Sequence, residues 1–327
     1  MDTAVNGPLA RLTLAEQAGE AFLWACAWDV AVRKPGNVSQ ASAGHRMQAA
    51  QFLASAQACA AALAAAGQPV GRRIEVAVAA TQQAVGCNTN LGIVLLCAPL
   101  AAAHELAGQA PGAGGPVQRL RQAWQRAMDG LTVADAAAAF RAIAQARPAG
   151  LGQAAEQDVR QPPQVSLGQA MALAAGRDRV AAQYGNGAQA LFETGLAALR
   201  HQPAAACKAL LDSPTPTATE AVEDDRARLV QAVYLALLAG EPDSHIVRKH
   251  GSALAHSVMR EALPWAKRSR AGETLGRDPA FAAWDESLKA RGLNPGSTAD
   301  LTVATLMAAR LSRGPGGALA SAGSAAG

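Results

Sequence analysis

Apolar residues are grouped in long blocks that Pro, Gly and polar turn residues separate, and no block alternates apolar and polar positions long enough to predict a strand. The block from Thr13 to Arg33 is the clearest helix, because Thr13 and Glu16 have the spacing of a capping box and Pro35 with Gly36 prevents continuation. Further helices are predicted at about residues 47–66, 72–85, 91–107, 117–128, 133–145, 218–239 and 298–311. The last three follow similar capping pairs, Thr132 with Asp135, Thr217 with Glu220 and Ser297 with Asp300.

Two segments rich in Pro and Gly interrupt this pattern, at residues 108–116 and 147–163. The second is longer than a simple turn requires, so we expect it to have a functional role. Short motifs that together resemble one protein family, described below, lie on both sides of each of these segments. This favours one helical domain over residues 1–312. Residues 313–327 (RGPGGALASAGSAAG) are rich in Gly, Ala and Ser and are predicted to form a disordered tail.

Composition supports an all-α fold made of one globular, multi-helix domain. Half of the 327 residues are hydrophobic and only 17% are charged, which is enough apolar material for a large core. Aromatic residues make up only 4%, and alanine dominates. Small apolar side chains favour close packing of helix on helix over sheets rich in Val, Ile and Tyr.

The charge of the chain, +4 with a pI near 9.0, suits a small anionic ligand. The basic residues are scattered, without a Lys/Arg tract or interleaved aromatic residues, so nucleic acid is not expected as a partner. The five cysteines lack CxxC spacing, which predicts free thiols in a reducing compartment rather than disulfides or a zinc site. They are Cys26, Cys59, Cys87, Cys97 and Cys207.

The sequence shows no pattern typical of export or of a membrane span. The N-terminus lacks a basic segment followed by an apolar one, so no signal peptide is expected. The longest apolar run, Leu91 to Ala103, is too short to span a bilayer. We therefore expect a soluble, cytoplasmic protein without a membrane partner.

The usual sequence motifs for nucleotide and metal binding are absent, since the chain has no GxxxxGK[ST], no GxGxxG after a strand and no HExxH. Helix N-termini can still bind anions through unpaired N–H groups. Two loops fit that role, residues 34–39 (KPGNVS) and 86–92 (GCNTNLG). Asn88, Thr89 and Asn90 are strong helix-capping residues, so capping alone is the alternative, although one cap does not require all three.

Isolated carboxylates are the second signal of a site. Asp29 lies in the apolar stretch FLWACAWDVAV and Glu75 in IEVAVAAT, where a charge is costly unless it is paired or binds a metal. Either could instead face solvent at helical spacing. Surface ion pairs are the alternative for the charged residues near turns, Asp158, Arg160, Arg177, Asp178, Asp243 and Arg248. His245, His250 and His256 do not share one helix face, so structural or surface roles are expected for them.

Together these motifs resemble the triphosphoribosyl-dephospho-CoA synthase family. The matching segments are residues 29–38 (DVAVRKPGNV), 52–56 (FLASA), 81–92 (TQQAVGCNTNLG) and 294–301 (NPGSTADL), in an order that covers nearly the whole chain. Residues 150–160, 177–184 and 243–251 look similar to the archaeal-type branch of the family, which is associated with one-carbon metabolism.

The resemblance implies an all-helical, ATP-dependent transferase that moves the triphosphoribosyl group of ATP to an alcohol such as 3'-dephospho-CoA and releases adenine. Mg²⁺ would accompany the triphosphate. Asp29 and Glu75 are the candidates for the base and for metal or ribose contacts, and the phosphates would be held by Lys34 and the loop of Asn88, Thr89 and Asn90. The remaining nucleotide contacts are expected from Gly36, Asn37, Asp243, Arg248 and Asp300.

The acceptor stays open at this point, because the chain departs from the citrate lyase and malonate decarboxylase branch. Asp29 stands near a usual Glu, Ser39 stands where an Asp follows the KPG turn, and no Asp lies between Arg46 and Met47. A related ATP-dependent step in building a methanopterin- or methanofuran-type cofactor is the runner-up. A phosphohydrolase and a non-catalytic helical scaffold are the further alternatives, and a homo-oligomer is compatible with the sequence.

Overall fold

The computed structural model of the protein describes residues 12–45, 47–110, 113–148, 150–217 and 223–313. Over these residues the chain is helical and has no strand, only two isolated bridges that join Ser39 with Ser42 and Gly44 with Met47. The helices are α1 (Leu14–Ala31), α2 (Ala49–Leu63), α3 (Val70–Val85), α4 (Leu91–Gln109), α5 (Pro116–Asp129), α6 (Val133–Ala146), α7 (Leu167–Ala174), α8 (Arg179–Gly185), η2 (Ala190–Gly195), α9 (Leu196–Arg200), α10 (Ala204–Asp212), α11 (Asp225–Gly240), α12 (Ser244–His250), α13 (Ser252–Arg270), η3 (Leu275–Arg277), α14 (Pro279–Ala290) and α15 (Gly296–Leu311). The all-α prediction is therefore confirmed.

Two of the predicted capping boxes form as expected, at Thr13 before α1 and at Thr132 before α6. The prediction for Ser297 with Asp300 is wrong, because α15 already begins at Gly296 after Pro295 and both residues lie inside the helix. α11 begins at Asp225, where the Asp224 carboxylate accepts from the N–H groups of Arg226 and Ala227. Glu220, part of the third predicted box, lies outside the described residues, as does the predicted tail beyond Arg313.

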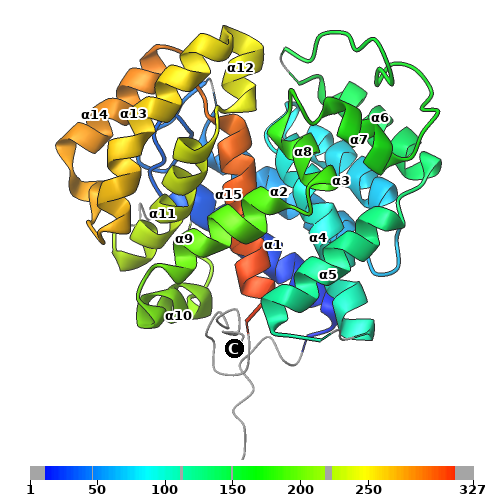
Figure 1. Cartoon of the computed structure of the whole chain (residues 1–327), viewed down its shortest axis with the longest axis horizontal. Helices are drawn as coiled ribbons and strands as arrows, with labels where there is room; N and C mark the ends of the chain where they lie inside the picture. The colour runs from blue at the N-terminus through cyan, green and yellow to red at the C-terminus, as the bar shows by residue number, and fades with distance from the viewer. Residues whose placement is uncertain (1–11, 46, 111–112, 149, 218–222, 314–327) are drawn as a thin grey trace, which may run out of the picture.

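α15 runs through the middle of the molecule and packs against α1, α4 and α11, so helices from both ends of the chain meet there (Figure 1). α2, α3, α6 and α7 lie on one side of it, and α11, α12, α13 and α14 lie on the other (Figure 1). Arg310 fixes α15 to α1 through an ion pair with Glu20 at 2.6 Å, and its guanidinium lies over the ring of Trp24. This arrangement brings the start of α15 beside the start of α4.

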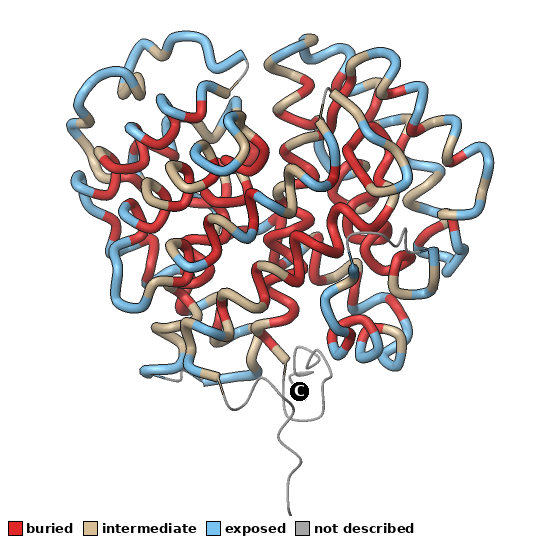
Figure 2. Tube along the Cα trace, turned by 180° about the vertical axis from the view of Figure 1, so that it is seen from behind, coloured by how far each residue is buried: buried red, intermediate tan, exposed pale blue. Residues whose placement is uncertain are grey.

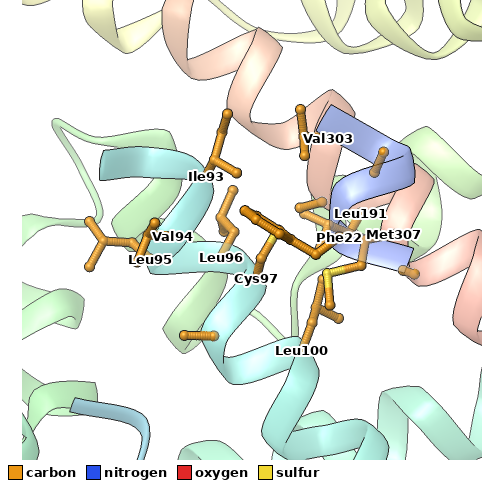
Figure 3. Packing of buried hydrophobic residues seen from close by; sticks show 14 of the residues in the cluster. Phe22, Ile93, Val94, Leu95, Leu96, Cys97, Leu100, Leu191, Val303 and Met307 are labelled. Atoms are coloured by element: carbon orange, nitrogen blue, oxygen red, sulfur yellow. The ribbon is translucent and has the colours of Figure 1, made fainter. Parts of the chain in front are cut away.

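The buried residues form a continuous band through the centre of the molecule (Figure 2). Figure 3 shows its middle, where Phe22 of α1, Leu96 and Leu100 of α4, and Val303 and Met307 of α15 pack together. Alanines occupy many of the remaining core positions, which lets helix axes approach closely, as the composition predicted. A second, smaller cluster packs α11, α13 and α14 around Phe281.

α4 is longer than the sequence analysis expected, since it continues to Gln109. With 19 residues it is long and apolar enough to cross a membrane by length and composition. The statement that this segment is too short to span a bilayer was therefore wrong. The helix is nevertheless a core element, because 67% of its apolar window is buried against other parts of the protein.

Pro99 interrupts the hydrogen bonding of α4 near its middle. A proline has no N–H, so it leaves the carbonyl four residues earlier, that of Leu95, without its helical partner. The hydroxyl of Tyr184 in α8 donates to that carbonyl at 2.6 Å. The proline is thereby tolerated in a buried helix, and α8 is fixed against α4 on the side that faces the cavity described below.

Candidate functional site

A cavity of about 570 Å³ lies between the two sides of the molecule, where the first turns of α4 and α15 meet α7, α8 and α12. Its polar wall includes seven of the residues expected from the sequence: Asp29, Asn37, Asn88, Thr89, Asn90, Arg248 and Asp300. The two predicted loops therefore converge on one site, although they are separated by 47 or more residues in the sequence. Lys34, Gly36, Asp243 and Glu75 do not line it.

Asp29 reaches the cavity from the last turn of α1, and Lys34 lies behind it. The ammonium of Lys34 donates to the backbone carbonyl of Asp29 at 2.5 Å and lies 3.3 Å from the carboxylate Oδ1. Both side chains are buried, and Oδ1 has no hydrogen-bond partner. Burial raises the pKa of Asp29, whereas the charge of Lys34 opposes that rise. Lys34 therefore supports the carboxylate and does not itself face the cavity.

The KPG turn is held in place by the far end of the chain. Gly36 has a φ of +80°, and a Cβ there would lie 2.8 Å from the carbonyl oxygen of Leu293, so only glycine fits this turn. The Gly36 N–H donates to buried Asp285 at 2.9 Å. The amide of Asn37 donates to Asn294 at 2.9 Å, just before α15. Gly36 thus has a structural role in placing Asn37 at the cavity.

The loop before α4 combines capping with a polar surface for the cavity. Asn88 Oδ1 accepts from the Leu91 N–H at 3.1 Å and so caps the helix, whereas Asn90 makes no side-chain cap. Thr89 shares a 2.6 Å hydrogen bond with Ser55 of α2. The Asn90 amide donates only a weak 3.5 Å bond to the sulfur of Cys59. Capping therefore explains Asn88 alone, and all three residues still line the cavity.

Asp300 lies on the second turn of α15 and faces the start of α4. A Cβ added to Gly92 would lie 2.0 Å from Asp300 Oδ2, so the carboxyl group occupies the space that this glycine leaves open. Within the described part of the chain its oxygens accept no hydrogen bond. Burial raises the pKa of Asp300 well above its usual value, and the nearby carboxylates of Asp243, Asp178 and Asp29 add to the rise. Asp300 is therefore poised to hold a proton.

Asp243 has a structural role that the sequence did not suggest. Its Oδ1 accepts from the His245 and Ile246 N–H groups at the start of α12. Its Oδ2 accepts from the hydroxyls of Ser297 and Thr298 at the start of α15, both at 2.8 Å. This fully buried carboxylate ties α12 to α15 and thereby sets the position of the cavity wall.

α12 presents Arg248 and His245 to the cavity. Arg248 forms a 2.6 Å ion pair with Asp178, which also caps α8, and its Nε has no hydrogen-bond partner. This pair agrees with the surface ion pair given as the alternative for Asp178, although Asp178 and Arg177 both line the cavity. His245, for which a structural or surface role was expected, lines the cavity as well. The three-residue spacing of His245 and Arg248 was the available signal, because it places both on one helix face.

Glu75 lies away from the cavity, on the outer side of α3. Arg72 and Arg141 contact its two carboxylate oxygens at 3.0 and 2.6 Å. The hydrogen bond from Arg141 is the largest influence on the pKa of Glu75, which is lowered. This placement matches the alternative reading of a solvated ion pair and gives a catalytic role no support.

The long connector of residues 147–163 forms no helix over its described residues, 147–148 and 150–163, and part of it lines the cavity. Gly150 packs against the backbone of Arg248, which joins the connector to α12. Leu151 and Val159 continue into an apolar wall formed with α6 and α7. The cavity thus has a polar half at the starts of α4, α12 and α15 and an apolar half under the connector.

The cysteines form no disulfides in the structure. All five are free thiols, and four of them are buried, as the sequence analysis expected. In the part of the chain that the structure describes, no group of three or more His, Cys, Asp or Glu side chains could hold a metal ion by itself. Any divalent cation would therefore need ligands from a bound molecule or from water.

Comparisons with known proteins agree with the motifs. A profile of the family described as ATP:dephospho-CoA triphosphoribosyl transferase matches residues 15–317. A crystal structure from Archaeoglobus fulgidus, of a proposed triphosphoribosyl-dephospho-CoA synthase, is similar with a TM-score of 0.53 and 21% identity over 79% of this chain and 97% of that chain. At this identity the similarity supports the fold alone. No curated protein matches the sequence significantly.

The family match covers almost all of the described residues, including both loops and the start of α15 that line the cavity. The resemblance seen in the sequence motifs is thereby confirmed. The chain belongs to the ATP:dephospho-CoA triphosphoribosyl transferase family.

Proposed function

We propose that the protein transfers the triphosphoribosyl group of ATP to the hydroxyl of dephospho-CoA, with release of adenine. The observation that carries this proposal is the pair of carboxyl groups, Asp29 and Asp300, that line one cavity in different electrostatic environments. Substitution at C1 of a ribose passes through a transition state of oxocarbenium character, as in glycosidases, which use such a pair. Groups with separated proton affinities are suited to act as acid and base.

Asp29 is the base in this mechanism. The adjacent Lys34 ammonium favours the ionised form of its carboxylate, and burial makes that carboxylate more basic than an exposed one. Asp29 would accept the proton of the acceptor hydroxyl as the oxygen forms its bond to C1 of the ribose. Lys34 acts through Asp29 and is a positioning residue.

Asp300 is the acid. Burial and neighbouring carboxylates raise its pKa and so favour the protonated form, and Gly92 leaves room for its carboxyl group. It would donate its proton to the departing adenine as the bond from C1 to the base breaks. The acceptor hydroxyl thus loses one proton to Asp29, and adenine gains one from Asp300. Proton exchange with solvent then returns Asp29 to its ionised form and Asp300 to its protonated form.

The polar half of the cavity supplies groups for the triphosphate. Arg248 is positively charged, and the first N–H groups of α4 lie beside Asn88, Thr89 and Asn90. The apolar half, under the connector, fits the uncharged arm of the acceptor. Its walls include Met171, Leu173 and Leu151, and the last two are 53% and 43% exposed at the rim.

Mg²⁺ is part of the proposal, and the Asp29 carboxylate fits it. This carboxylate lines the cavity, and its Oδ1 makes no hydrogen bond, although the Lys34 ammonium lies 3.3 Å away. Mg²⁺ bound to phosphates keeps several waters and needs only one or two carboxylates, so Asp29 would suffice as its protein contact. The cation would neutralise charge on the triphosphate. We also propose a cytoplasmic location, which the free thiols support.

The test is an assay of the purified protein with ATP, Mg²⁺ and dephospho-CoA that follows both adenine and inorganic phosphate. Adenine release that depends on the acceptor supports the transferase. Phosphate release without adenine would instead indicate a phosphohydrolase, and no ATP-dependent shift in Tm would indicate a helical scaffold. Replacing dephospho-CoA by pterin or furan alcohols tests the one-carbon alternative directly.

A further inference from the structure

His245 is one of the polar residues that line the cavity and that the proposed mechanism does not use. It lies on the first turn of α12, lines the cavity, and its Nε2 is buried without a hydrogen-bond partner. A buried donor or acceptor without a partner destabilises the free protein. The protein therefore carries an unsatisfied group at the point where the proposed substrate binds.

The ring is held in this position by its surroundings. Asp243 Oδ1 accepts a hydrogen bond from the backbone N–H of His245 at 2.9 Å, and Asp243 Oδ2 bonds Ser297, which anchors this backbone to α15. A Cβ added to Gly296 would lie 2.6 Å from His245 Nδ1, so the imidazole packs directly on the backbone of the first residue of α15. The ring is thus fixed at the junction of α12 and α15 rather than free at the surface.

The charged groups around His245 are mostly cationic. Burial is the main cause that lowers the pKa of His245 to about 4, and Arg248, Lys249 and His45 lower it further, against the opposing effect of Asp243. Arg177 adds a further cation at the cavity wall. Asp178 neutralises part of the charge of Arg248, and Asp300 shares the cavity, where burial raises its pKa and disfavours its ionised form. In the free protein the imidazole is therefore neutral.

We propose that His245, together with Arg248 and Arg177, forms the subsite for the triphosphate, and that His245 takes up a proton when the triphosphate binds. This inference rests on the proposed function for the identity of the anion. The anion reverses the repulsion from the surrounding cations and accepts a hydrogen bond from the imidazolium, so the protonated ring becomes the favoured form. Binding of the triphosphate then depends on pH even when no covalent bond of the ligand is made or broken.

The consequence for affinity follows from linkage. The pKa of His245 is higher in the complex than in the free protein, so complex formation takes up a proton at any pH between the two values. In that range the affinity falls as pH rises, by up to about tenfold per pH unit. Above the pKa of the complex the contribution of His245 disappears.

The experiment measures binding of inorganic triphosphate to the intact protein by calorimetry at pH 6 and pH 7, without added Mg²⁺, in buffers of different protonation enthalpy. His245→Gln keeps an amide donor but cannot titrate in this range. His250→Gln is the matched control, because His250 lies on the same helix, bonds the Gly292 carbonyl at 3.0 Å and does not line the cavity. Any proton that triphosphate itself takes up or releases on binding contributes equally in all three proteins, so it cancels when their proton uptake is compared.

We expect the wild-type protein and His250→Gln to take up more protons per ligand than His245→Gln, by up to about one, and to lose affinity more steeply with pH. Equal proton uptake in all three proteins would overturn the proposal, and so would an absence of triphosphate binding to the wild type. Proton-coupled binding in a protein that never releases adenine would leave this inference standing and refute the transferase.

A second measurement decides the matter if His245→Gln does not fold. The NMR titration of the histidine ring protons in the wild-type protein should show one midpoint that moves up by more than about one pH unit on adding triphosphate. Unchanged midpoints for all observed histidines would contradict the proposal.

Discussion

Gly92→Ala is the sharpest test of the role of Asp300. The added methyl group would lie 2.0 Å from Asp300 Oδ2 and 2.5 Å from its Cγ. Carbon and oxygen atoms that are not bonded need roughly 3.0 Å or more, so the carboxyl group must move by on the order of 1 Å. Because it is the end of a side chain, it can do so without unfolding α4 or α15. A displacement of this size costs on the order of 10²-fold in rate when the group takes part in the chemistry.

Stability should fall only slightly in the same variant. Alanine is favoured over glycine inside a helix by about 0.5–1 kcal/mol, which offsets part of the cost of moving Asp300. The assay compares adenine release and Tm for Gly92→Ala with Gly240→Ala, a helical glycine whose added Cβ meets nothing within 4 Å. A folded Gly92→Ala protein with wild-type turnover would refute the assignment of Asp300 as the acid.

Three further outcomes follow from the same geometry. Asp29→Asn should lower the rate of adenine release by ~10²–10⁴-fold. Glu75→Gln should change Tm only slightly and keep turnover near wild type, and an equal loss of turnover in both variants would place Glu75 in the site. Asp285→Asn leaves the ammonium of buried Lys289 without its carboxylate partner at 3.0 Å and should destabilise the fold by about 3–5 kcal/mol in denaturant titrations. Because the pKa of Asp300 rises on folding, the wild type loses stability as pH increases above about 4, so Asp300→Asn should melt higher at pH 7 and equally at pH 3.

Local sequence determined the helices and many of their ends. Thr13 and Thr132 form capping boxes with residues three positions later, and Gly86 ends α3 in the left-handed conformation, so these boundaries depend only on neighbouring residues. The same reasoning failed at Ser297, because its hydroxyl donates to Asp243, a residue 54 positions away. It also missed α13, which continues through Pro264.

The site itself required the tertiary structure. The sequence could indicate that Asp29 and Glu75 were unusual carboxylates in apolar stretches, but only the packing of α3 and α6 shows that Arg141 neutralises Glu75 at the surface. Likewise, Lys34 was identified as a phosphate contact, and its burial behind Asp29 changes that role. Periodicity states which residues share a helix face, but not which helix that face meets.

Family membership could be inferred from the order of short motifs, because each keeps its spacing along the chain. The pairing of Asp29 with Asp300 that we propose as base and acid could not, because the pKa values of both carboxyl groups depend on burial and on charges supplied by distant segments. The same holds for His245, whose neighbours Arg248, Asp243 and Gly296 meet only where α12 packs on α15. Spacing along the chain therefore determined the helices and the family, whereas the distances between helices decided which side chains can share a substrate.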